Sequence, residues 1–232
     1  MSIEMPTGLE RPPIRGALRE ISAPLDWLSV GVRAGQLRSA PKGDGRPIML
    51  LPGYRSSARA MYPLARFMRS KNYNVRQWGL GTNMGEIYDY VELIGERLKA
   101  EDGEPITLIG WSLGGVVARE IARLYEPHVR EIITMGTPIV GGPKYTIVGD
   151  RFAEAQGFDL DEYEEYVHSV NVLGLSQPIT AFYSKRDGIV GWQSTIDVYN
   201  AQTRNIEVNA AHLGIGVNAK VWIEIAETLA AS

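Results

Sequence analysis

The sequence predicts a protein of the α/β class, with a mostly parallel sheet of about six strands flanked by helices. Two observations support this class. Short apolar runs alternate with amphipathic segments along the chain, and turns rich in Gly, Pro, Asn or Asp separate them. Such alternation is typical of βαβ units, whose consecutive strands run parallel. The length of 232 residues is enough for one domain with a full core.

Six short runs are predicted as strands, and longer segments between them as helices. The runs are bounded by turn residues, whereas the helical segments carry apolar residues at helical spacing. The predicted strands cover residues 48–51, 74–78, 106–109, 131–135, 179–183 and 205–208. The predicted helices cover residues 60–70, 88–100, 113–125 and 217–230. Active groups gather at the carboxyl ends of parallel strands, so we expect the site in residues that follow these strands.

Residues 1–45 are predicted as an N-terminal extension packed on the core, and residues 46–232 as the α/β domain. The extension is rich in Pro, Gly and Arg. Apolar residues within it indicate a helix broken at Pro24 and laid on the domain; they are Leu18, Ile21, Leu25, Leu28 and Val32. A membrane-surface or partner-binding segment is the alternative. Simple packing is favoured because the basic residues are not massed on one face.

The regular alternation breaks at residues 141–177, which we interpret as a short cap insertion after the fourth predicted strand. This segment holds an acidic and aromatic block over residues 159–167, and its expected form is one or two short helices. Four of its side chains are spaced to share one helical face toward a pocket: Tyr163, Tyr166, Val167 and Val170. The alternative is a solvent-exposed surface segment that does not cover the site.

Composition and charge exclude several classes of function. The net charge of −3 and the isoelectric point near 5.7 give no reason to expect nucleic-acid binding. The absence of cysteine excludes disulfides, thiolate catalysis and cysteine metal sites. The histidines, at positions 128, 168 and 212, are too scattered for a local metal site, and we expect no metal or organic cofactor. With no secretory signal pattern and no apolar stretch of about 18 residues, we expect a cytoplasmic protein without a transmembrane segment.

The most informative stretch is residues 110–115, Gly-Trp-Ser-Leu-Gly-Gly, between a predicted strand and a predicted helix. The pattern indicates a sharp strand-to-helix turn with Ser112 at its apex, where a base and a substrate can both reach the hydroxyl. A strained serine in such a turn requires neighbours without a Cβ, which Gly110 and Gly114 provide. The alternative is an ordinary glycine-rich turn in which Ser112 caps the helix.

A nucleophilic serine needs a base and an acid that orients the base, here in the chain order Ser, Asp or Glu, His. His212 follows the last predicted strand and precedes the closing helix, so it is the candidate base. Asp187 follows the preceding predicted strand and is the candidate acid, with turn initiation as the alternative role. Asp197 competes, but it lies ten residues beyond Asp187 and is expected to be exposed. His128 is expected at the surface, and His168 is expected to be structural.

Backbone N–H groups are expected to stabilise negative charge that develops on the substrate. The Leu113 N–H begins the helix after the serine and is the first expected donor. The second is the Tyr54 N–H, in the loop after the first predicted strand, where Gly53 lets the backbone approach the substrate. An ordinary Pro-Gly turn is the alternative there. The residues expected to bind the substrate are Trp111, Tyr163, Tyr166 and Val170.

Six short motifs follow one another in order: LPGY at 51–54, WGLGTN at 78–83, GWSLGG at 110–115, GTP at 136–138, DGIV at 187–190 and HLG at 212–214. This ordered set resembles the bacterial lipase/esterase-like α/β-hydrolases, from about residue 47 to the C-terminus. The resemblance implies carboxylic ester hydrolysis through an acyl-enzyme, with Ser112 as nucleophile, His212 as base and Asp187 as acid. Tyr54 and Leu113 would then form the oxyanion hole.

The resemblance has a departure and leaves other functions open. Many relatives have His-Gly where this chain has Pro52-Gly53, a change that the backbone donor can survive. The compact chain argues against an extensive lipase lid and favours small or soluble acyl esters over emulsified fat. The same residues would also serve an acyltransferase or a thioesterase, and a non-catalytic binding protein could keep the fold. The expected partner is a small-molecule ester, while interfacial contact and oligomeric state stay open.

Overall fold

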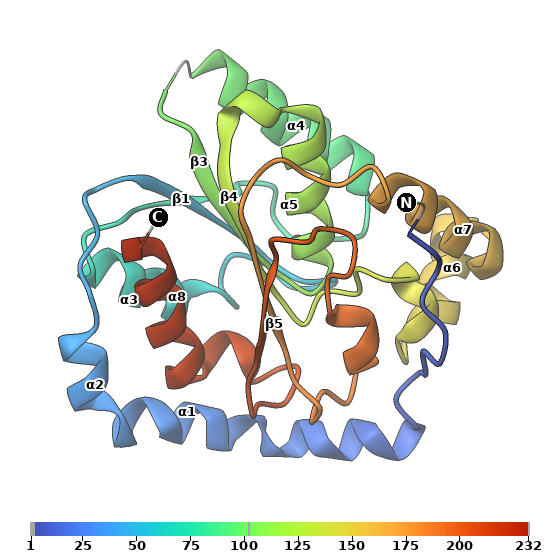
Figure 1. The fold of residues 1–232 in the computed structure, drawn as a ribbon. Coiled ribbons are helices and arrows are strands. Elements are labelled where there is room, and N and C mark those ends of the chain that lie inside the picture. The colour runs from blue at the N-terminus through green and yellow to red at the C-terminus, as the bar shows by residue number, and fades with distance from the viewer. Residues whose placement is uncertain (1–2, 102, 232) are drawn as a thin grey trace.

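The computed structural model, which describes residues 3–101 and 103–231, contains a six-stranded sheet whose neighbouring strands are all parallel (Figure 1). The strand order is β2-β1-β3-β4-β5-β6. This confirms the predicted α/β class and mostly parallel sheet. Strand ends differ from the predicted ones by one or two residues, because pairing with the neighbouring strands decides where each strand stops. The strands are β1 (Pro47–Leu51), β2 (Asn74–Gln77), β3 (Ile106–Trp111), β4 (Val129–Met135), β5 (Ile179–Tyr183) and β6 (Arg204–Glu207).

Helices cover both faces of the sheet. In β1, Ile48 and Leu50 join the core cluster that includes α3 and α8, whereas Met49 and Leu51 join the cluster that includes α4 and α5. A parallel sheet that is covered on both faces requires apolar residues at successive positions, and the Ile-Met-Leu-Leu run of β1 meets that requirement. The covering helices are α3 (Tyr62–Ser70), α4 (Ile87–Ala100), α5 (Leu113–Leu124) and α8 (Ala219–Ala231).

The carboxyl ends of four strands carry the predicted site residues. Leu51 of β1 is in register with Gly110 of β3, and Met135 of β4 is in register with both Trp111 and Phe182. Because these ends lie side by side, the loops that follow them share one edge of the sheet. Those loops contain Tyr54, Ser112, Asp187 and His212.

The insertion at residues 141–177 contains short helices between β4 and β5. They are the 3-10 helix η3 (Gly142–Tyr145), α6 (Gly149–Gln156) and α7 (Leu160–Asn171), and they contact one another. Asp159 caps α7, since its Oδ1 accepts the N–H groups of Asp161 and Glu162 at 2.8 and 3.1 Å. In Figure 1, α6 and α7 lie together at one side of the sheet, next to the N-terminus.

Residues 14–39, called the arm below, run along one edge of the domain (Figure 1). The arm comprises the 3-10 helix η1 (Ile14–Ser22), α1 (Ala23–Val32) and α2 (Ala34–Ser39). The change from 3-10 to α geometry falls at Ala23, beside Pro24, where the sequence predicts a break. None of the helices in the described part of the chain has the length and apolar character required to cross a membrane.

The orientation of the arm corrects the sequence prediction. Simple packing would bury its apolar residues, but five of them face solvent with 62% to 86% of their surface exposed: Leu18, Ile21, Leu25, Leu28 and Val32. The arm contacts the domain through hydrogen bonds of Glu20 and Asp26, and Val30 and Leu37 pack against the core. Hydrogen bonds of these side chains to loops of the domain fix which face turns inward, and spacing of apolar residues alone does not contain that information.

Candidate active site

Ser112 lies at the junction of β3 and α5 in a backbone conformation that few residues adopt. Its φ is 53° and its ψ is −124°. A non-glycine residue in this region is strained and persists only where the surroundings enforce it. Ser112 occupies the N-cap position of α5, but its side chain makes no capping hydrogen bond. The structure therefore contradicts the helix-cap alternative and leaves the hydroxyl free for another partner.

The glycines around Ser112 leave no room for a side chain. A Cβ added to Gly110 would overlap Gly115, and one added to Gly114 would overlap the Leu51 carbonyl. A Cβ on Gly115 would overlap the side chain of Thr137, from the loop after β4. The turn is sharp because two strands and the first turn of α5 meet within van der Waals distance, which only glycine allows at these positions.

Asp187 and His212 form a buried pair beyond the ends of β5 and β6. His212 Nδ1 lies 2.6 Å from Asp187 Oδ2, and each residue is only 3% exposed. Asp187 Oδ1 accepts the backbone N–H groups of Ile189 and Val190 at 2.9 and 2.7 Å. Both carboxylate oxygens are thus engaged, so the carboxylate is fixed and holds the imidazole through Nδ1. This orientation leaves Nε2 as the nitrogen that can take a proton.

Burial and charge act in opposite directions on the pKa of His212. Burial of the ring lowers the pKa, because it penalises the imidazolium. The Asp187 carboxylate raises the pKa by its charge and by its hydrogen bond, and the charge of Glu20 adds to this. The net result is a His212 pKa above its ordinary value of 6.5. The paired carboxylate therefore stabilises the protonated ring, as a general base requires.

Backbone and ring contacts connect this pair to the serine turn. The Ser112 N–H donates to the Met135 carbonyl at 2.8 Å. Gly136, which follows Met135, lies beside the histidine, since a Cβ added to it would be 3.0 Å from His212 Nδ1. Trp111 Nε1 donates to the His212 carbonyl at 3.2 Å. Within the described ranges no hydrogen bond joins Ser112 Oγ to the imidazole. Such bonds often tighten only when substrate binds.

Two backbone N–H groups near the serine have no acceptor among the described residues. Neither Leu113 nor Tyr54 donates its N–H to another residue in the part of the chain that the structure describes. Leu113 is the first residue of α5, where N–H groups point out of the helix end. The Tyr54 loop lies close to the turn, since a Cβ on Gly53 would lie 3.2 Å from Ser112 Cβ. Both N–H groups are free to donate to a negatively charged oxygen of a bound molecule.

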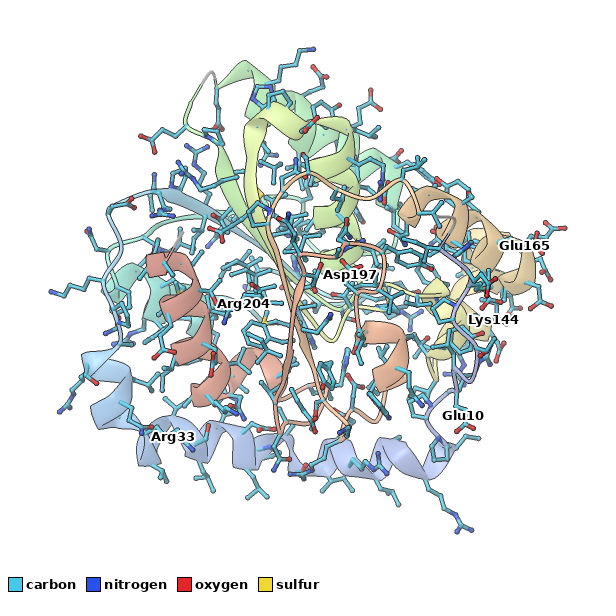
Figure 2. All side chains as sticks on the ribbon, viewed as in Figure 1. Glu10, Arg33, Lys144, Glu165, Asp197 and Arg204 are labelled. Carbon is cyan, nitrogen blue, oxygen red and sulfur yellow. The ribbon has the colours of Figure 1, made fainter. Side chains whose placement is uncertain are left out.

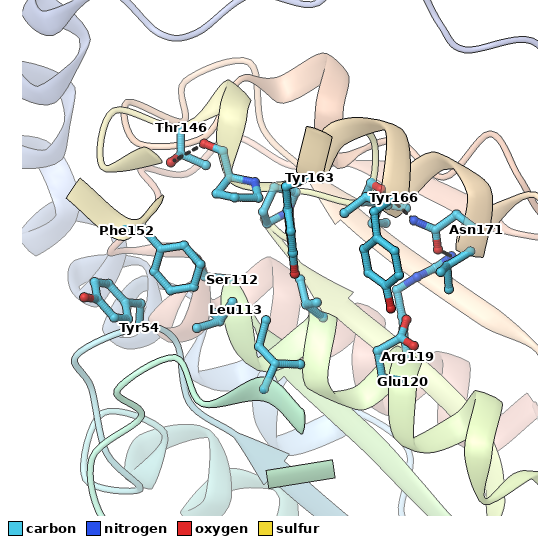
Figure 3. Close-up of a pocket in the computed structure, with 18 of the residues that line it drawn as sticks. Tyr54, Ser112, Leu113, Arg119, Glu120, Thr146, Phe152, Tyr163, Tyr166 and Asn171 are labelled. Atoms are coloured by element: carbon cyan, nitrogen blue, oxygen red, sulfur yellow. Dashed lines mark hydrogen bonds between the residues drawn. The ribbon is translucent and has the colours of Figure 1, made fainter. Parts of the chain in front are cut away.

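A pocket of about 870 Å³, its open mouth included, lies between α5 and the inserted helices (Figure 3). Ser112, Leu113 and Tyr54 line it. Figure 3 shows Tyr163 and Tyr166 reaching from α7 toward α5, with Phe152 and Tyr54 nearer the serine. The residues predicted to share one face of α7 all line the pocket: Tyr163, Tyr166, Val167 and Val170. The walls are mostly apolar and suit an apolar group next to the serine.

Two sequence expectations about this region are wrong. Trp111, expected to bind substrate, does not line the pocket and packs instead against the core and the His212 ring, with ring centroids 5.7 Å apart. Asp197, expected to be exposed, is 3% exposed and pairs with the buried Arg119 at 2.8 Å. Asn200 and Thr203 also donate to the Asp197 carboxylate. Asp197 therefore neutralises Arg119 and is not a second acid for the histidine.

The remaining histidines lie apart from the pair. His168 Nδ1 is 3.1 Å from the Tyr199 hydroxyl, and His128 is half-buried in the 3-10 helix η2 (Glu126–His128) that follows α5. No group of three His, Asp or Glu side chains within residues 3–101 and 103–231 is arranged to hold a metal ion.

Glu20 of the arm connects the loops of the candidate acid and base, and the sequence analysis missed it. Glu20 Oε1 accepts the N–H groups of Gly188 and His212 at 2.9 and 3.0 Å, and Oε2 accepts that of Leu213 at 2.8 Å. The only signal in the sequence is that residues 14–39 contain just two acidic residues, Glu20 and Asp26. The partners of Glu20 lie 168 to 193 positions away along the chain, so no local sequence pattern could identify its role.

Comparison with known proteins identifies the family. A family model described as the alpha/beta hydrolase fold matches residues 51–171, more than half of the chain. The chain belongs to this family. The matched segment contains Ser112 and Leu113 and ends before Asp187 and His212. A search of curated proteins found no match.

Many solved structures share this alpha/beta hydrolase fold at low sequence identity. A lipase-esterase related protein from Clostridium acetobutylicum is 17% identical, with a TM-score of 0.56 over 82% of this chain and 96% of its own. Carboxylesterase CesB (YbfK) from Bacillus subtilis is 13% identical, with a TM-score of 0.57 over 83% and 85%. The N-acyl homoserine lactonase AidH is 18% identical, with a TM-score of 0.54 over 83% and 90%. At these identities the likeness shows the fold alone.

Proposed function

We propose that this alpha/beta hydrolase is a serine carboxylic-ester hydrolase that works through an acyl-enzyme. The observation that carries the proposal is the buried His212–Asp187 pair next to a strained Ser112 that lines an apolar pocket. The N–H groups of Tyr54 and Leu113 support it, because both residues line the same pocket as Ser112 and neither N–H donates to another described residue, so both can donate to an oxyanion. The esterases among the structural neighbours are consistent with it.

The acylation step uses Ser112, His212 and the two N–H groups. His212 Nε2 takes the proton of Ser112 Oγ as the oxygen forms a bond to the ester carbonyl carbon. The carbonyl oxygen becomes an oxyanion, which the N–H groups of Leu113 and Tyr54 stabilise. Collapse of this intermediate breaks the bond to the alcohol oxygen, and His212 returns the proton to that oxygen. The alcohol leaves, and the acyl group stays on Ser112.

Deacylation repeats the sequence with water. His212 takes a proton from water as the water oxygen attacks the acyl carbon, and the resulting oxyanion occupies the same hole. Collapse breaks the bond to Ser112 Oγ, which recovers its proton from His212, and the carboxylic acid departs. The Asp187 carboxylate stabilises the imidazolium that forms twice in each cycle.

Residues 141–177 would act as the cap that shapes the acyl site. Their helices supply Phe152, Tyr163, Tyr166 and Val170 to the pocket walls. Figure 3 shows Ser112 near Tyr54 and Phe152, while Tyr166 and Asn171 lie toward the opposite end. An acyl chain bound to Ser112 would therefore run along the apolar wall of α7. As expected from the compact chain, we propose short and medium acyl chains as the preferred substrates.

A series of p-nitrophenyl esters from acetate to palmitate, combined with a fluorophosphonate probe, tests the proposal. We expect labelling by the probe and the highest kcat/KM on esters from acetate to hexanoate. Labelling with faster turnover of acyl-CoA than of any ester would favour thioester hydrolysis instead. Absence of both labelling and turnover in folded protein would contradict a serine hydrolase and favour a binding protein.

Val170→Trp is expected to narrow the acyl preference. Val170 lines the pocket, so a larger side chain should exclude long chains and spare acetate. We expect kcat/KM for octanoate to fall roughly tenfold or more relative to acetate, the scale on which pocket contacts discriminate neighbouring substrates. The measurement is the octanoate-to-acetate ratio of kcat/KM. Ser169→Trp, at the exposed neighbouring position, is the control and should leave the ratio unchanged. Equal ratios in Val170→Trp and wild type would place the acyl chain elsewhere.

A further inference from the structure

We propose that the arm binds an anionic lipid surface. Its outer face is formed by six large apolar side chains at three- and four-residue spacing: Ile14, Leu18, Ile21, Leu25, Leu28 and Val32. Each is between 62% and 90% exposed. In Figure 2 carbon-only side chains project outward from this ribbon along the lower edge of the molecule. Single exposed apolar residues are ordinary, but a continuous row of this length marks an interaction site.

The inner face of the arm is anchored by hydrogen bonds, so the apolar face cannot roll inward without breaking them. Glu20 accepts three backbone N–H groups of the domain, as described above. Asp26, which is 7% exposed, accepts from Asn218 Nδ2 at 2.7 Å and from the Ala211 N–H at 3.3 Å. Ser29 Oγ accepts the Ala219 N–H at 3.0 Å. The outward position of the apolar residues is therefore built into the fold.

Charge identifies the chemistry of the partner. Residues 14–39 carry four arginines and two acidic residues, a net charge of +2 in a chain whose net charge is −3. All four arginines are exposed: Arg15, Arg19, Arg33 and Arg38. Both acidic side chains turn inward to the hydrogen bonds above. What the arm presents to solvent is therefore apolar and cationic, the combination that binds at the surface of an anionic bilayer. Trp27, which is 48% exposed, adds the aromatic side chain typical of such interfaces.

A second copy of the chain fits this surface less well. Pairing two arms would bring two sets of the same arginines together, and neither arm exposes an acidic side chain to neutralise them. Like charges at close range oppose association. A lipid surface supplies the missing negative charge and leaves both arms free.

Cosedimentation with vesicles tests the proposal and does not depend on the hydrolase activity. The wild-type protein should sediment with an equal mixture of phosphatidylcholine and phosphatidylglycerol, and weakly with phosphatidylcholine alone. Leu18→Ser, Ile21→Ser and Leu25→Ser in one protein should lower the affinity about tenfold or more, because the apolar face supplies insertion. Arg15→Gln with Arg38→Gln should lower it on anionic vesicles only. Because all these positions are exposed, the melting temperature should stay unchanged.

The matched control replaces three equally exposed leucines elsewhere, Leu93→Ser, Leu124→Ser and Leu173→Ser, which are 54% to 75% exposed. It should bind anionic vesicles like the wild type. Failure of the wild type to bind anionic vesicles would overturn the proposal, as would an equal loss in the control. A dimer in analytical ultracentrifugation that the arm substitutions dissociate, without vesicle binding, would also overturn it and assign the face to a second copy.

A second inference concerns Glu20 and rests on the proposed function. We infer that Glu20 is a positioning residue for His212 and Asp187. One carboxylate binds the N–H groups of Gly188, next to the acid, and of His212 and Leu213 in the base loop. The arm passes close to the acid loop, since a Cβ on Gly16 would lie 3.7 Å from Gly188 Cα. Glu20 thus fixes the two loops relative to each other, and with them the two side chains of the pair.

Glu20→Ala is expected to lower kcat on p-nitrophenyl acetate by on the order of tenfold to hundredfold, the cost of a misplaced catalytic group. KM should stay within about twofold, because the pocket does not include Glu20. Glu20→Gln keeps one acceptor oxygen but turns an amide N–H₂ toward a backbone donor, so it should recover part of kcat. If Glu20 only stabilised the fold, Glu20→Ala would lower the melting temperature, but the folded protein would not show a lower kcat at constant KM.

Histidine imidazole NMR provides a readout that does not need turnover. Glu20→Ala should shift the His212 resonances and leave those of His128 and His168 in place. Ser39→Ala, an exposed position in the arm, should shift none of them. Unchanged kcat and unchanged His212 resonances would overturn the inference. A wild-type protein that hydrolyses no ester, with His212 resonances that still respond to Glu20, would contradict the proposed function and uphold the positioning.

Discussion

Ser112→Ala is expected to abolish ester hydrolysis in a protein that remains folded. Loss of the nucleophile of a serine hydrolase lowers kcat by roughly 10⁶-fold, about 8 kcal/mol of transition-state stabilisation. Removal of Oγ should not affect folding, because this oxygen makes no hydrogen bond within the described residues. The backbone bond from the Ser112 N–H to the Met135 carbonyl remains available to the variant. The measurements are kcat on p-nitrophenyl butyrate, fluorophosphonate labelling and thermal melting.

The control for this prediction is Ser169→Ala, at an exposed serine of α7. It should keep both labelling and turnover. Substantial activity of Ser112→Ala at wild-type stability would show that Ser112 is not the nucleophile. Loss of activity together with a lower melting temperature would instead point to damage of the strained turn. In that case, fluorophosphonate labelling of the folded fraction of Ser112→Ala would show that another residue is the nucleophile.

Asp187→Asn is expected to lower kcat/KM by about 10³- to 10⁴-fold, as loss of the orienting carboxylate does in serine hydrolases. Asn can donate its amide to Nδ1, which favours the tautomer with the proton on Nε2, the wrong nitrogen for a base. Asp150→Asn, an exposed carboxylate bonded to Arg11, is the matched control. Activity of Asp187→Asn within tenfold of the wild type would remove Asp187 from the proposed mechanism.

The same variant should change the pH dependence in a defined direction. The base acts only when it is neutral, so wild-type kcat/KM should fall as the pH drops through the His212 pKa. That pKa lies above 6.5 because the charge and hydrogen bond of Asp187, with Glu20, outweigh burial. Without the Asp187 charge, burial dominates and lowers the pKa. The acid limb of the residual activity should therefore move to lower pH in Asp187→Asn. A limb that moves to higher pH would contradict this account.

Local sequence patterns were sufficient to predict the turn and the order of the candidate residues. The six strands and the covering helices follow from short apolar runs and helical spacing, and the parallel sheet follows from their alternation. Ser112, Asp187 and His212 each follow a strand, and the parallel sheet brings strand ends to one edge. Tyr54 and Leu113, the proposed oxyanion-hole donors, could be named from the sequence for the same reason, because backbone donors depend on position and not on side chain.

Long-range contacts were not predictable from such patterns. Trp111 adjoins the serine in sequence, but the alternation of side chains along β3 turns it toward the core and the His212 ring. Asp197 is polar and lies in a loop, but it is buried because it forms an ion pair with Arg119 of α5. Both corrections depend on partners more than 70 residues away, 101 for Trp111 and 78 for Asp197.

By itself, the sequence determined the α/β class, the strained serine turn and the identity of the residues that follow each strand. These features depend on local periodicity and on glycines whose lack of a Cβ lets the strands and the helix approach closely at the serine turn. Only the tertiary structure decided how the arm is oriented and that Glu20 joins the acid and base loops. The physical reason is that the spacing of apolar residues defines a face of the arm but not the direction in which that face turns. The direction is set by hydrogen bonds from Glu20 and Asp26 to loops almost two hundred residues away.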